Sequence, residues 1–252
     1  MLAQERRGKI IEITKKLGSV EVDMLAQNLN VSTMTIRRDL SQLEKEGLLK
    51  RTHGGAIARD EIIYSEKKSS HRDAKISIAK KASSYIKEGD CIFVDAGTTT
   101  YELAKYIKKM ERLTVVTTDL EIALLLKNSN NQVYICGGKV QNSTGSMSDS
   151  YTLQMIQNFY FDLGFFGAAC INSEFIVMTP TTDKSWLKRL VVEHCKHSYL
   201  LVDDSKFHRE AVTKINALED YTGVITDKVF SQEELQLVRK REISLISMEK
   251  KS

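Results

Sequence analysis

Apolar positions recur with the period of a helix in three short segments within residues 4–46. The first segment ends at Gly18, and the second has apolar residues at i, i+3, i+4 and i+7 within residues 22–29. The third begins at Ser32, a residue type that caps helix N-termini, and places Ile36 and Leu40 inward. The pattern therefore predicts three short amphipathic helices.

The outward face of the third helix is polar and cationic. Its members lie at i, i+3, i+4 and i+7 or in the first turn: Thr33, Met34, Thr35, Arg37, Arg38 and Ser41. Two short helices joined by a tight turn, the second presenting arginines and hydroxyls, are typical of a helix-turn-helix whose recognition helix enters the major groove. Arginine can bind guanine edges bidentately, and Ser and Thr hydroxyls can reach phosphates or bases.

Residues 48–57 alternate weakly and turn at the pair Gly54-Gly55. A small basic β-wing lying on the phosphate backbone would have this pattern, with Lys50, Arg51 and His53 as its polar residues. The residues predicted to contact or support contact with DNA are Ser32, Thr33, Met34, Thr35, Arg37, Arg38, Lys50, Arg51 and His53.

Beyond residue 73, apolar runs alternate with helical patterns. The runs occupy residues 91–97, 113–119, 132–138, 163–171, 198–204, 222–227 and 243–247. Alternation of this kind predicts a mostly parallel sheet with helices on both faces. The expected fold is thus a winged helix-turn-helix over residues 1–57, a polar linker over 58–73 and an α/β domain over 74–252.

Small and polar residues cluster where the predicted strands end, which is the edge at which open α/β sheets bind ligands. The segment Asp95–Thr99 comes directly before a helix, and a helix amino end with hydroxyls and a glycine favours a phosphate. Such a segment can equally be a plain helix cap. Lys188 and Lys206 could supply positive charge, although most lysines are simply solvated. The predicted effector-binding residues are Asp95, Gly97, Thr98, Thr99, Thr118, Asp119, Gly137, Gly138, Lys188 and Lys206.

The charge of the chain is concentrated at its start. The 252 residues hold 37 Lys/Arg and 33 Asp/Glu, a net charge of +4. Residues 1–59 hold 11 basic and 7 acidic residues, a surplus of four, and the remainder holds 26 of each. A solvated helix face or a protein-docking bundle would also be charged. The surplus lies on the predicted recognition helix and wing, which favours DNA as the partner.

Several other classes of protein are excluded by the sequence. No run approaches the roughly 18 apolar residues of a membrane helix, and no apolar h-region follows the first charges, so no membrane partner and a cytoplasmic location are expected. The four cysteines are far apart and mostly within apolar runs, as expected of small buried hydrophobes in a reducing compartment. His194, Cys195 and His197 form the densest ligand-like cluster, but neighbours at a helix end point in different directions. No metal and no cofactor are therefore expected.

The segment at residues 31–56 is VSTMTIRRDLSQLEKEGLLKRTHGGA, and it resembles the DNA-binding segment of the DeoR family of bacterial transcriptional regulators. The resemblance covers the helix-turn-helix and the wing almost without gaps. It implies that Arg37 and Arg38 belong to the recognition helix and that Thr33 and Thr35 support DNA contact. We expect Asp39 to be structural, because a carboxylate beside DNA phosphates would be costly.

Residues 72–228 resemble the sensor domain of the same family, which is similar in fold to ribose-5-phosphate isomerase. The matching motifs are IAKKA, D-x-G-T-T, V-V-T-T, C-G-G, D-x-x-F-x-G and V-D-D-S-K-F. The resemblance implies a phosphorylated sugar or related metabolite as effector, with Asp95, Gly97, Thr98, Thr99, Gly137 and Lys206 at or near its site.

Two positions depart from that family pattern. Asp119 stands where many relatives carry asparagine, and Lys184 stands four residues ahead of Lys188 where a glutamate is common. A carboxylate near a phosphate is unfavourable unless a cation pairs with it. We therefore expect either an altered pocket or an effector that differs from the commonest ones.

The favoured hypothesis is a transcriptional repressor of a carbohydrate-metabolism operon, relieved by a phosphorylated sugar. Paired half-sites need paired recognition helices, so a homodimer or higher homo-oligomer is expected. One alternative is a sugar-phosphate isomerase or hydrolase fused to a DNA-binding head, with Asp95 as general base and Lys206 as electrostatic stabiliser. We expect no enzyme, because no nucleophile–base pair is visible. A domain that only oligomerises is a further alternative.

Overall fold

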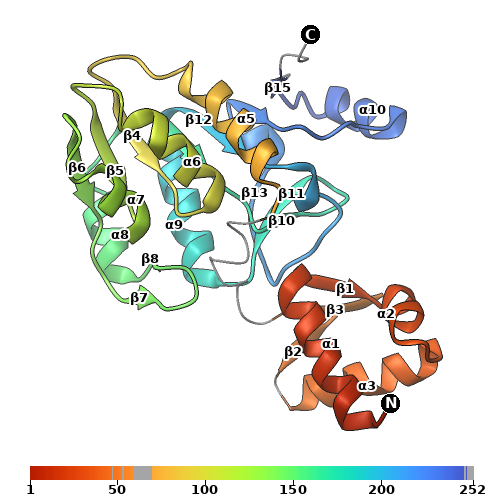
Figure 1. Cartoon of the computed structure of the whole chain (residues 1–252). Coiled ribbons are helices and arrows are strands. Elements are labelled where there is room, and N and C mark those ends of the chain that lie inside the picture. Colours follow the sequence, from red (N-terminus) through yellow and green to blue (C-terminus); the bar gives the residue numbers. More distant parts are fainter. Residues whose placement is uncertain (47, 53, 59–69, 247, 249–252) are drawn as a thin grey trace.

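The computed structural model describes residues 1–46, 48–52, 54–58, 70–246 and 248. The chain forms a small head, residues 1–58, and a larger body, residues 70–248 (Figure 1). The predicted linker 58–73 lies mostly outside the described residues. Its first residue, Ala58, ends a strand, and its last two, Arg72 and Asp73, begin a helix. The domain boundaries given above remain predictions.

The head contains the three predicted helices and the wing. Its elements are α1 (Ala3–Leu17), β1 (Ser19–Glu21), α2 (Val22–Leu29), α3 (Thr33–Lys45), β2 (Leu49–Arg51) and β3 (Gly55–Ala58). The three strands form one antiparallel sheet in the order β1-β3-β2. The strand β1 was not predicted, because three residues are too few to show a period. Ile10, Leu25, Ile36 and Leu40 are fully buried in the core of the head.

Glycine is required where β1 and β3 meet. A Cβ on Gly55 would lie 1.8 Å from the carbonyl oxygen of Val20, closer than any side chain can approach. Gly55 is therefore required for the packing of β3 against β1. Gly18 follows α1 with a φ of 79°, a conformation that ends the helix at little cost to glycine.

The body is built on a seven-stranded parallel sheet in the order β15-β14-β12-β9-β4-β5-β6. All seven predicted runs contribute a strand to it. The strands are β4 (Cys91–Val94), β5 (Thr114–Thr117), β6 (Gln132–Ile135), β9 (Phe161–Phe166), β12 (Cys195–Leu201), β14 (Gly223–Ile225) and β15 (Leu245–Ile246). The helices are α5 (Arg72–Ser83), α6 (Thr98–Ile107), α7 (Leu120–Leu126), α8 (Ser150–Ile156), α9 (Thr182–Glu193) and α10 (Gln232–Lys240).

Two smaller sheets were not predicted. One joins β10 (Cys170–Ile171), β11 (Ile176–Thr179) and β13 (Thr213–Ala217), and the other is the hairpin of β7 (Val140–Gln141) and β8 (Ser146–Met147). The apolar run 163–171, expected to be one strand, divides into β9 and β10. Strands β7, β8 and β10 have two residues each, too few for a pattern to mark them, whereas β11 and β13 have four and five residues and were missed.

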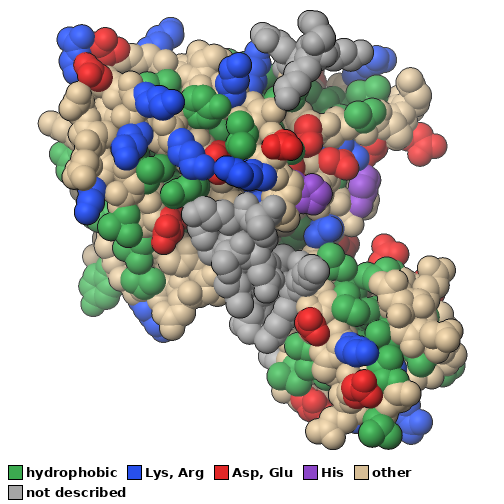
Figure 2. All heavy atoms as spheres, in the orientation of Figure 1, with side chains coloured by type: hydrophobic (Ala, Val, Ile, Leu, Met, Phe, Trp, Pro, Cys, Tyr) green, Lys and Arg blue, Asp and Glu red, His purple; other side chains and the backbone are tan. Residues whose placement is uncertain are grey.

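The two faces of the large sheet have separate cores. On β4, Phe93 packs on one face with Phe161 and Phe166, whereas its neighbours Ile92 and Val94 pack on the other. This alternation is the two-residue period of a strand covered on both sides. No helix in the described part of the chain is long and apolar enough to cross a membrane. On the face of the body shown in Figure 2, both acidic and basic side chains are present, in keeping with its balanced charge.

All four cysteines are free thiols. Cys136 and Cys170 are buried, and Cys91 and Cys195 are half-buried. Burial raises the pKa of Cys136 and of Cys195 to about 12, so both remain protonated at neutral pH. They act as small apolar side chains, as the sequence predicts.

Candidate functional site

The outward face of α3 is exposed. Thr33, Met34, Arg37 and Arg38 are all exposed, and Met34 keeps 73% of its surface open. An apolar side chain of this size is unusual at such exposure and lies beside two arginines on the same face. The face therefore has the composition of a surface that contacts base edges and phosphates.

The helix begins where the sequence predicts. The side-chain oxygen of Ser32 accepts a hydrogen bond from the backbone N–H of Thr35 at 3.2 Å, and the two hydroxyls lie 2.9 Å apart. This cap satisfies an N–H that has no partner within the helix. Ser32 and Thr35 thus hold the first turn of α3 in shape.

Asp39 is structural, as expected. It is buried, and its Oδ2 accepts a hydrogen bond from Arg6 Nε at 2.6 Å. Its Oδ1 lies 3.9 Å from Arg7 Nε. Asp39 lies on the inward side of α3, so its ion pair with Arg6 joins α3 to α1. Arg37 and Arg38 remain on the outward face of α3.

The wing is tied to α3 by Arg51. Its Nη1 donates to the hydroxyl of Ser41 at 2.8 Å, and its backbone N–H donates to Glu44 Oε1 at 3.0 Å. Arg51 is therefore half-buried, while Lys50 is exposed. His53 lies outside the described residues.

A pocket lies in the body at the carboxyl ends of β4, β5, β9 and β12, as predicted for an α/β sheet. Its cavity volume is about 50 Å³. The lining comprises Asp95, Ala96, Gly97, Thr98, Thr99, Thr118, Thr144, Ser146, Met147, Gly167, Ala168, Ala169, Thr179, Lys184, Leu187, Lys188, Leu201 and Lys206. It brings together seven of the ten residues predicted from the sequence.

An ion pair between α9 and the end of β4 forms one wall. Lys188 Nζ lies 2.6 Å from Asp95 Oδ2, and it also donates to the carbonyl of Gly167 at 2.7 Å. The N–H of Gly167 donates to the same Asp95 oxygen at 2.9 Å. The side chains of Lys188 and Asp95 are 9% and 2% exposed, so both charges are held away from water.

The amino end of α6 forms the second wall. Thr98 and Thr99 are buried in its first turn, and Gly97 is its N-cap. The free N–H groups and the helix dipole make this end attractive to an anion. Gly97 is extended, with a φ of 166°, and a Cβ there would lie 3.2 Å from Thr100 Oγ1.

A third cluster of lining residues was not among the predicted site residues, although Lys184 was noted from the sequence as a departure from the family pattern. Lys184 is buried on α9 one turn before Lys188, and its Nζ donates to Thr144 Oγ1 at 3.3 Å. The hydroxyls of Thr144 and Ser146 lie 2.8 Å apart in the β7–β8 hairpin. The i, i+4 spacing of the two lysines could have indicated Lys184. Nothing in the local pattern indicates the hairpin.

Asp119, Gly137 and Gly138 are not among the residues that line the pocket in the described structure. Asp119 caps α7, where its Oδ1 accepts the N–H of Ile122 at 3.1 Å. Burial raises the pKa of Asp119 to about 6, and the nearby charge of Asp95 adds to the rise.

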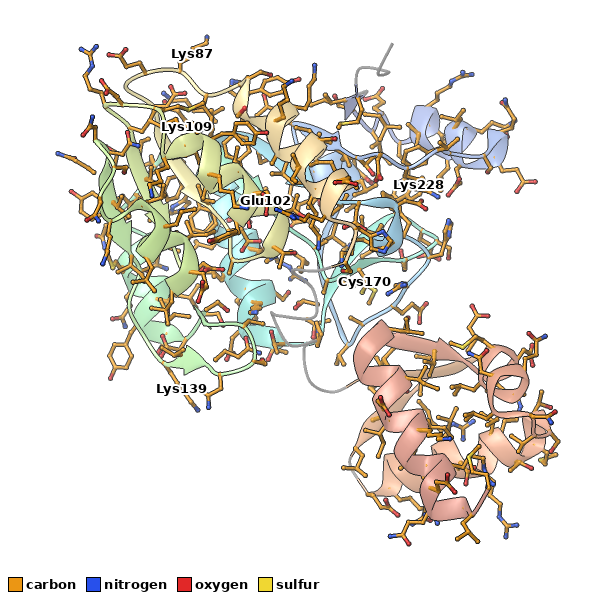
Figure 3. The ribbon with its side chains drawn as sticks, in the orientation of Figure 1. Lys87, Glu102, Lys109, Lys139, Cys170 and Lys228 are labelled. Atoms are coloured by element: carbon orange, nitrogen blue, oxygen red, sulfur yellow. The ribbon has the colours of Figure 1, made fainter. Side chains whose placement is uncertain are left out.

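The two glycines pack against α8 instead. The carbonyl of Gly137 accepts a hydrogen bond from Thr152 Oγ1 at 2.9 Å. Gly138 has a φ of +146°, and a Cβ there would lie 2.3 Å from Asp149 Oδ1. Lys139, labelled in Figure 3, follows at the start of the hairpin, and its N–H donates to Asp149.

Lys206 reaches the pocket from a short 3-10 turn, η1 (Asp204–Lys206). Asp203 caps this turn through the N–H of Ser205 at 3.1 Å. Behind it, Lys228 Nζ lies 5.2 Å from the ring centre of Phe207 and 3.2 Å from Glu234 Oε1 (Figure 3). Lys228 thus joins the segment that carries Lys206 to Glu234 of α10.

The same turn leads to the head. Three residues after Lys206, Arg209 Nη1 donates to the carbonyl of Leu17, the last residue of α1, at 2.6 Å. Its backbone N–H donates to the carbonyl of Ile171 at 3.1 Å. A cation at a helix carboxyl end is favoured by the helix dipole and satisfies a carbonyl without a helical partner.

Two family models match the chain. Residues 6–61 match the DeoR-like helix-turn-helix domain, and residues 70–228 match the DeoR C terminal sensor domain. The head and the body each correspond to one of these models.

Named relatives match over almost their whole length. The chain is 36% identical over 231 residues to a transcriptional regulator named FruR from Bacillus subtilis, covering 90% of this chain and 92% of that one. It is 32% identical over 235 residues to the lactose phosphotransferase system repressor of Staphylococcus aureus, covering 90% and 93%. A ribose 5-phosphate isomerase A from Methanocaldococcus jannaschii is similar over 55% of each chain, at 17% identity and a TM-score of 0.41.

Proposed function

Because the chain belongs to the DeoR family of DNA-binding transcriptional regulators, we propose that it represses an operon of carbohydrate metabolism and that a phosphorylated sugar relieves the repression. Two of its relatives are named as repressors, one of the lactose phosphotransferase system and one of the aga operon. The observation that carries the proposal is the buried, hydroxyl- and lysine-lined pocket at the carboxyl edge of the sheet.

The pocket has the chemistry of a phosphate site. Three lysines and one aspartate line it, so cations exceed anions there. Thr98 and Thr99 add hydroxyls at a helix amino end, where a phosphate is favoured over a neutral group. The hydroxyls of Thr144 and Ser146 suit the hydroxyl groups of a sugar. We assign the phosphate to the α6 end and the sugar to the hairpin.

The outer face of α3 is our proposed surface for operator DNA. Arg37, Arg38, Thr33 and Met34 would face the major groove, and Lys50 would lie on the phosphate backbone. Ser32 and Arg51 support this surface through the cap and the wing contact described above. A homo-oligomer would present a second head to the other half-site.

The two sites would be coupled through the segment that follows β12. An effector that draws Lys206 inward shifts the turn η1 and, with it, Arg209 at the end of α1. Binding then changes the position of the head, so that DNA-bound and effector-bound states differ in free energy. The cavity volume of about 50 Å³ is small beside that of ordinary ligand sites, and we propose that part of the wall moves when the effector enters.

Binding rather than catalysis is our assignment for the pocket. Asp95 is the carboxylate in its lining, and Lys188 and the N–H of Gly167 already occupy one of its oxygens. A general base must be able to reach a substrate proton, and these contacts withdraw Oδ2 of Asp95 from that role. We place the protein in the cytoplasm, together with its DNA.

Calorimetric titration of the purified protein with a panel of sugar phosphates and their unphosphorylated sugars tests the effector class. We expect saturable binding of a sugar phosphate and none of the matching free sugar, with no product formed on long incubation. Equal binding of the free sugar would remove the phosphate from the proposal. Sustained turnover would establish the enzyme alternative.

A further inference from the structure

The strand β6 is the exposed edge of the seven-stranded sheet. Figure 1 shows it at the outer margin of the body, with no other described element beyond it. Tyr134 is 41% exposed and Ile135 is 36% exposed. Exposed edge strands are places where another strand can pair, and proteins usually protect them.

The backbone of β6 offers hydrogen bonds on its outer side. The N–H of Gln132 donates to the carbonyl of Leu113 at 2.9 Å, and the N–H of Cys136 donates to the carbonyl of Thr117 at 2.8 Å. Alternate residues of a strand direct their N–H and C=O groups to opposite sides. The backbone groups of Val133 and Ile135 therefore point out of the sheet edge, away from β5.

This edge lacks the usual protection. The segment from Asn128 to Gly138 contains no charged residue and no proline. Charged side chains, proline and very short strands are the common means of keeping edges apart. The opposite edge has such protection, since β15 is only two residues long. No like charges would oppose each other if two β6 segments met.

We infer that β6 is the subunit interface of a homodimer, in which the strands of two copies pair antiparallel about a two-fold axis at Tyr134. Val133 then lies opposite Ile135 of the partner subunit, and each such pair exchanges two backbone hydrogen bonds. Tyr134 lies opposite Tyr134 of the partner subunit. Two seven-stranded sheets become one continuous sheet.

The side chains of β6 suit this pairing. The ring of Tyr134 packs edge-on against Phe159 with ring centres 5.4 Å apart, which fixes it beside the two-fold axis on one face of the sheet. Val133 and Ile135 lie on the other face, where Val133 packs against the core. Pairing would cover apolar surface on both faces of the strand, and directly opposed aromatic residues favour such a pair.

A second copy is the occupant that the edge favours. A two-fold interface brings the same surface of both subunits together, so that surface must be complementary to itself. Two uncharged β6 strands can pair antiparallel in this way without placing like charges opposite each other. Two copies also bring two heads into one particle, and helix-turn-helix dimers occupy paired half-sites. The inference goes beyond the proposed function, because β6 pairs whether or not an effector binds.

Sedimentation of the full-length protein over a range of concentrations tests the interface. We expect a dimer for the wild type and monomers for Ile135→Lys and for Val133→Pro. The proline removes an N–H that points outward, so no bond within the sheet is lost. Val229→Lys places the same charge at a site 89% exposed and should remain a dimer. A monomeric wild type, or dimeric Ile135→Lys and Val133→Pro proteins with native circular dichroism, would overturn the inference.

Cross-linking tests the register. Opposed residues of a non-hydrogen-bonded antiparallel pair have Cα atoms about 4.5 Å apart, which lies within the range of a disulfide. Tyr134→Cys should therefore form a covalent dimer on mild oxidation, whereas Val229→Cys and the wild type should not. A Tyr134→Cys protein that stays uncross-linked as a folded dimer would exclude this axis. Neither assay contains DNA or effector, so dimeric Ile135→Lys and Val133→Pro proteins would exclude β6 alone and leave the proposed function intact. A monomeric wild type would in addition remove the homo-oligomer from the proposed function.

Discussion

Lys188 and Asp95 form an ion pair of 2.6 Å that is almost completely withdrawn from water. Both partners also bond to the backbone of Gly167, so the end of β4, the end of β9 and α9 are joined at one point. An ion pair of this kind contributes little net stability. Replacing only one of its two partners nevertheless lowers the free energy of unfolding strongly, because the other charge stays buried without a partner. Its value here is to hold a lysine in fixed position beside the amino end of α6.

Breaking the pair on one side should destabilise the body. We expect Asp95→Asn or Lys188→Met to lower the free energy of unfolding by about 3 kcal/mol, because an uncompensated charge is left buried. The double variant Asp95→Asn/Lys188→Met should recover part of that loss. Denaturant titration measures these changes.

The exposed ion pair between Lys196 and Asp162 is the matched control. Their side chains are 75% and 35% exposed, so Lys196→Met should lower the free energy of unfolding far less than Lys188→Met does. Equal losses for Lys188→Met and Lys196→Met would contradict the account of a buried pair.

Removing either arginine of α3 should weaken operator binding. We expect Arg37→Ala and Arg38→Ala each to lose about 1–3 kcal/mol of binding free energy, as is usual for base or phosphate contacts. Fluorescence anisotropy with an operator duplex measures the loss. Arg239→Ala, which removes an exposed arginine of α10, is the control and should bind normally. Unchanged affinity for one α3 variant would remove that residue from the DNA surface.

Asp119 should make stability depend on pH. Its folded pKa is about 6, above the ordinary value of 3.8, so folding favours the protonated form. Its contribution to stability is therefore complete below about pH 4 and is lost as the pH rises through about 6. A shift of this size corresponds to about 3 kcal/mol.

The variant Asp119→Asn tests this pH dependence. Its amide oxygen can still accept the N–H of Ile122, and the repulsion from Asp95 disappears. We expect its advantage over the wild type, measured by thermal unfolding, to grow between pH 4 and pH 7. Parallel pH profiles for the two proteins would show that Asp119 has an ordinary pKa.

Arg209 should couple effector binding to DNA release. Arg209→Met removes the bond to the carbonyl of Leu17 and keeps an unbranched side chain of similar reach. We expect this variant to bind operator and effector with wild-type affinity but to release DNA less when the effector is added. Glu210→Met, at the exposed neighbouring position, should release DNA normally. Normal DNA release by Arg209→Met would show that the bond from Arg209 to Leu17 does not couple effector binding to DNA release.

The large elements of the fold follow from local patterns. The helices of the head were predicted from their apolar periodicity, and the seven strands of the parallel sheet from apolar runs that alternate with helical segments. The carboxyl edge of that sheet then located Asp95, Thr98, Thr99 and Lys206 in one place.

The remaining parts of the pocket depend on contacts between distant segments. Thr144 and Ser146 belong to a hairpin of two-residue strands, and Lys184 needs the packing of α9 to reach them. Asp119 and Gly138 were expected in the pocket because they follow strand ends, yet they are used to cap α7 and to pack against α8. A strand end fixes the neighbourhood of a residue but not the direction of its side chain.

The central claim is that the cationic head holds operator DNA and that the body releases it on binding a sugar phosphate. Equilibrium binding to the protein's own promoter fragment, at several salt concentrations and with and without each sugar phosphate, tests it most directly. We predict preference for the promoter over unrelated DNA, affinity that falls as salt rises, and release by one phosphorylated sugar but not by its free sugar. Binding without promoter preference, or promoter binding that no sugar phosphate alters, would contradict it.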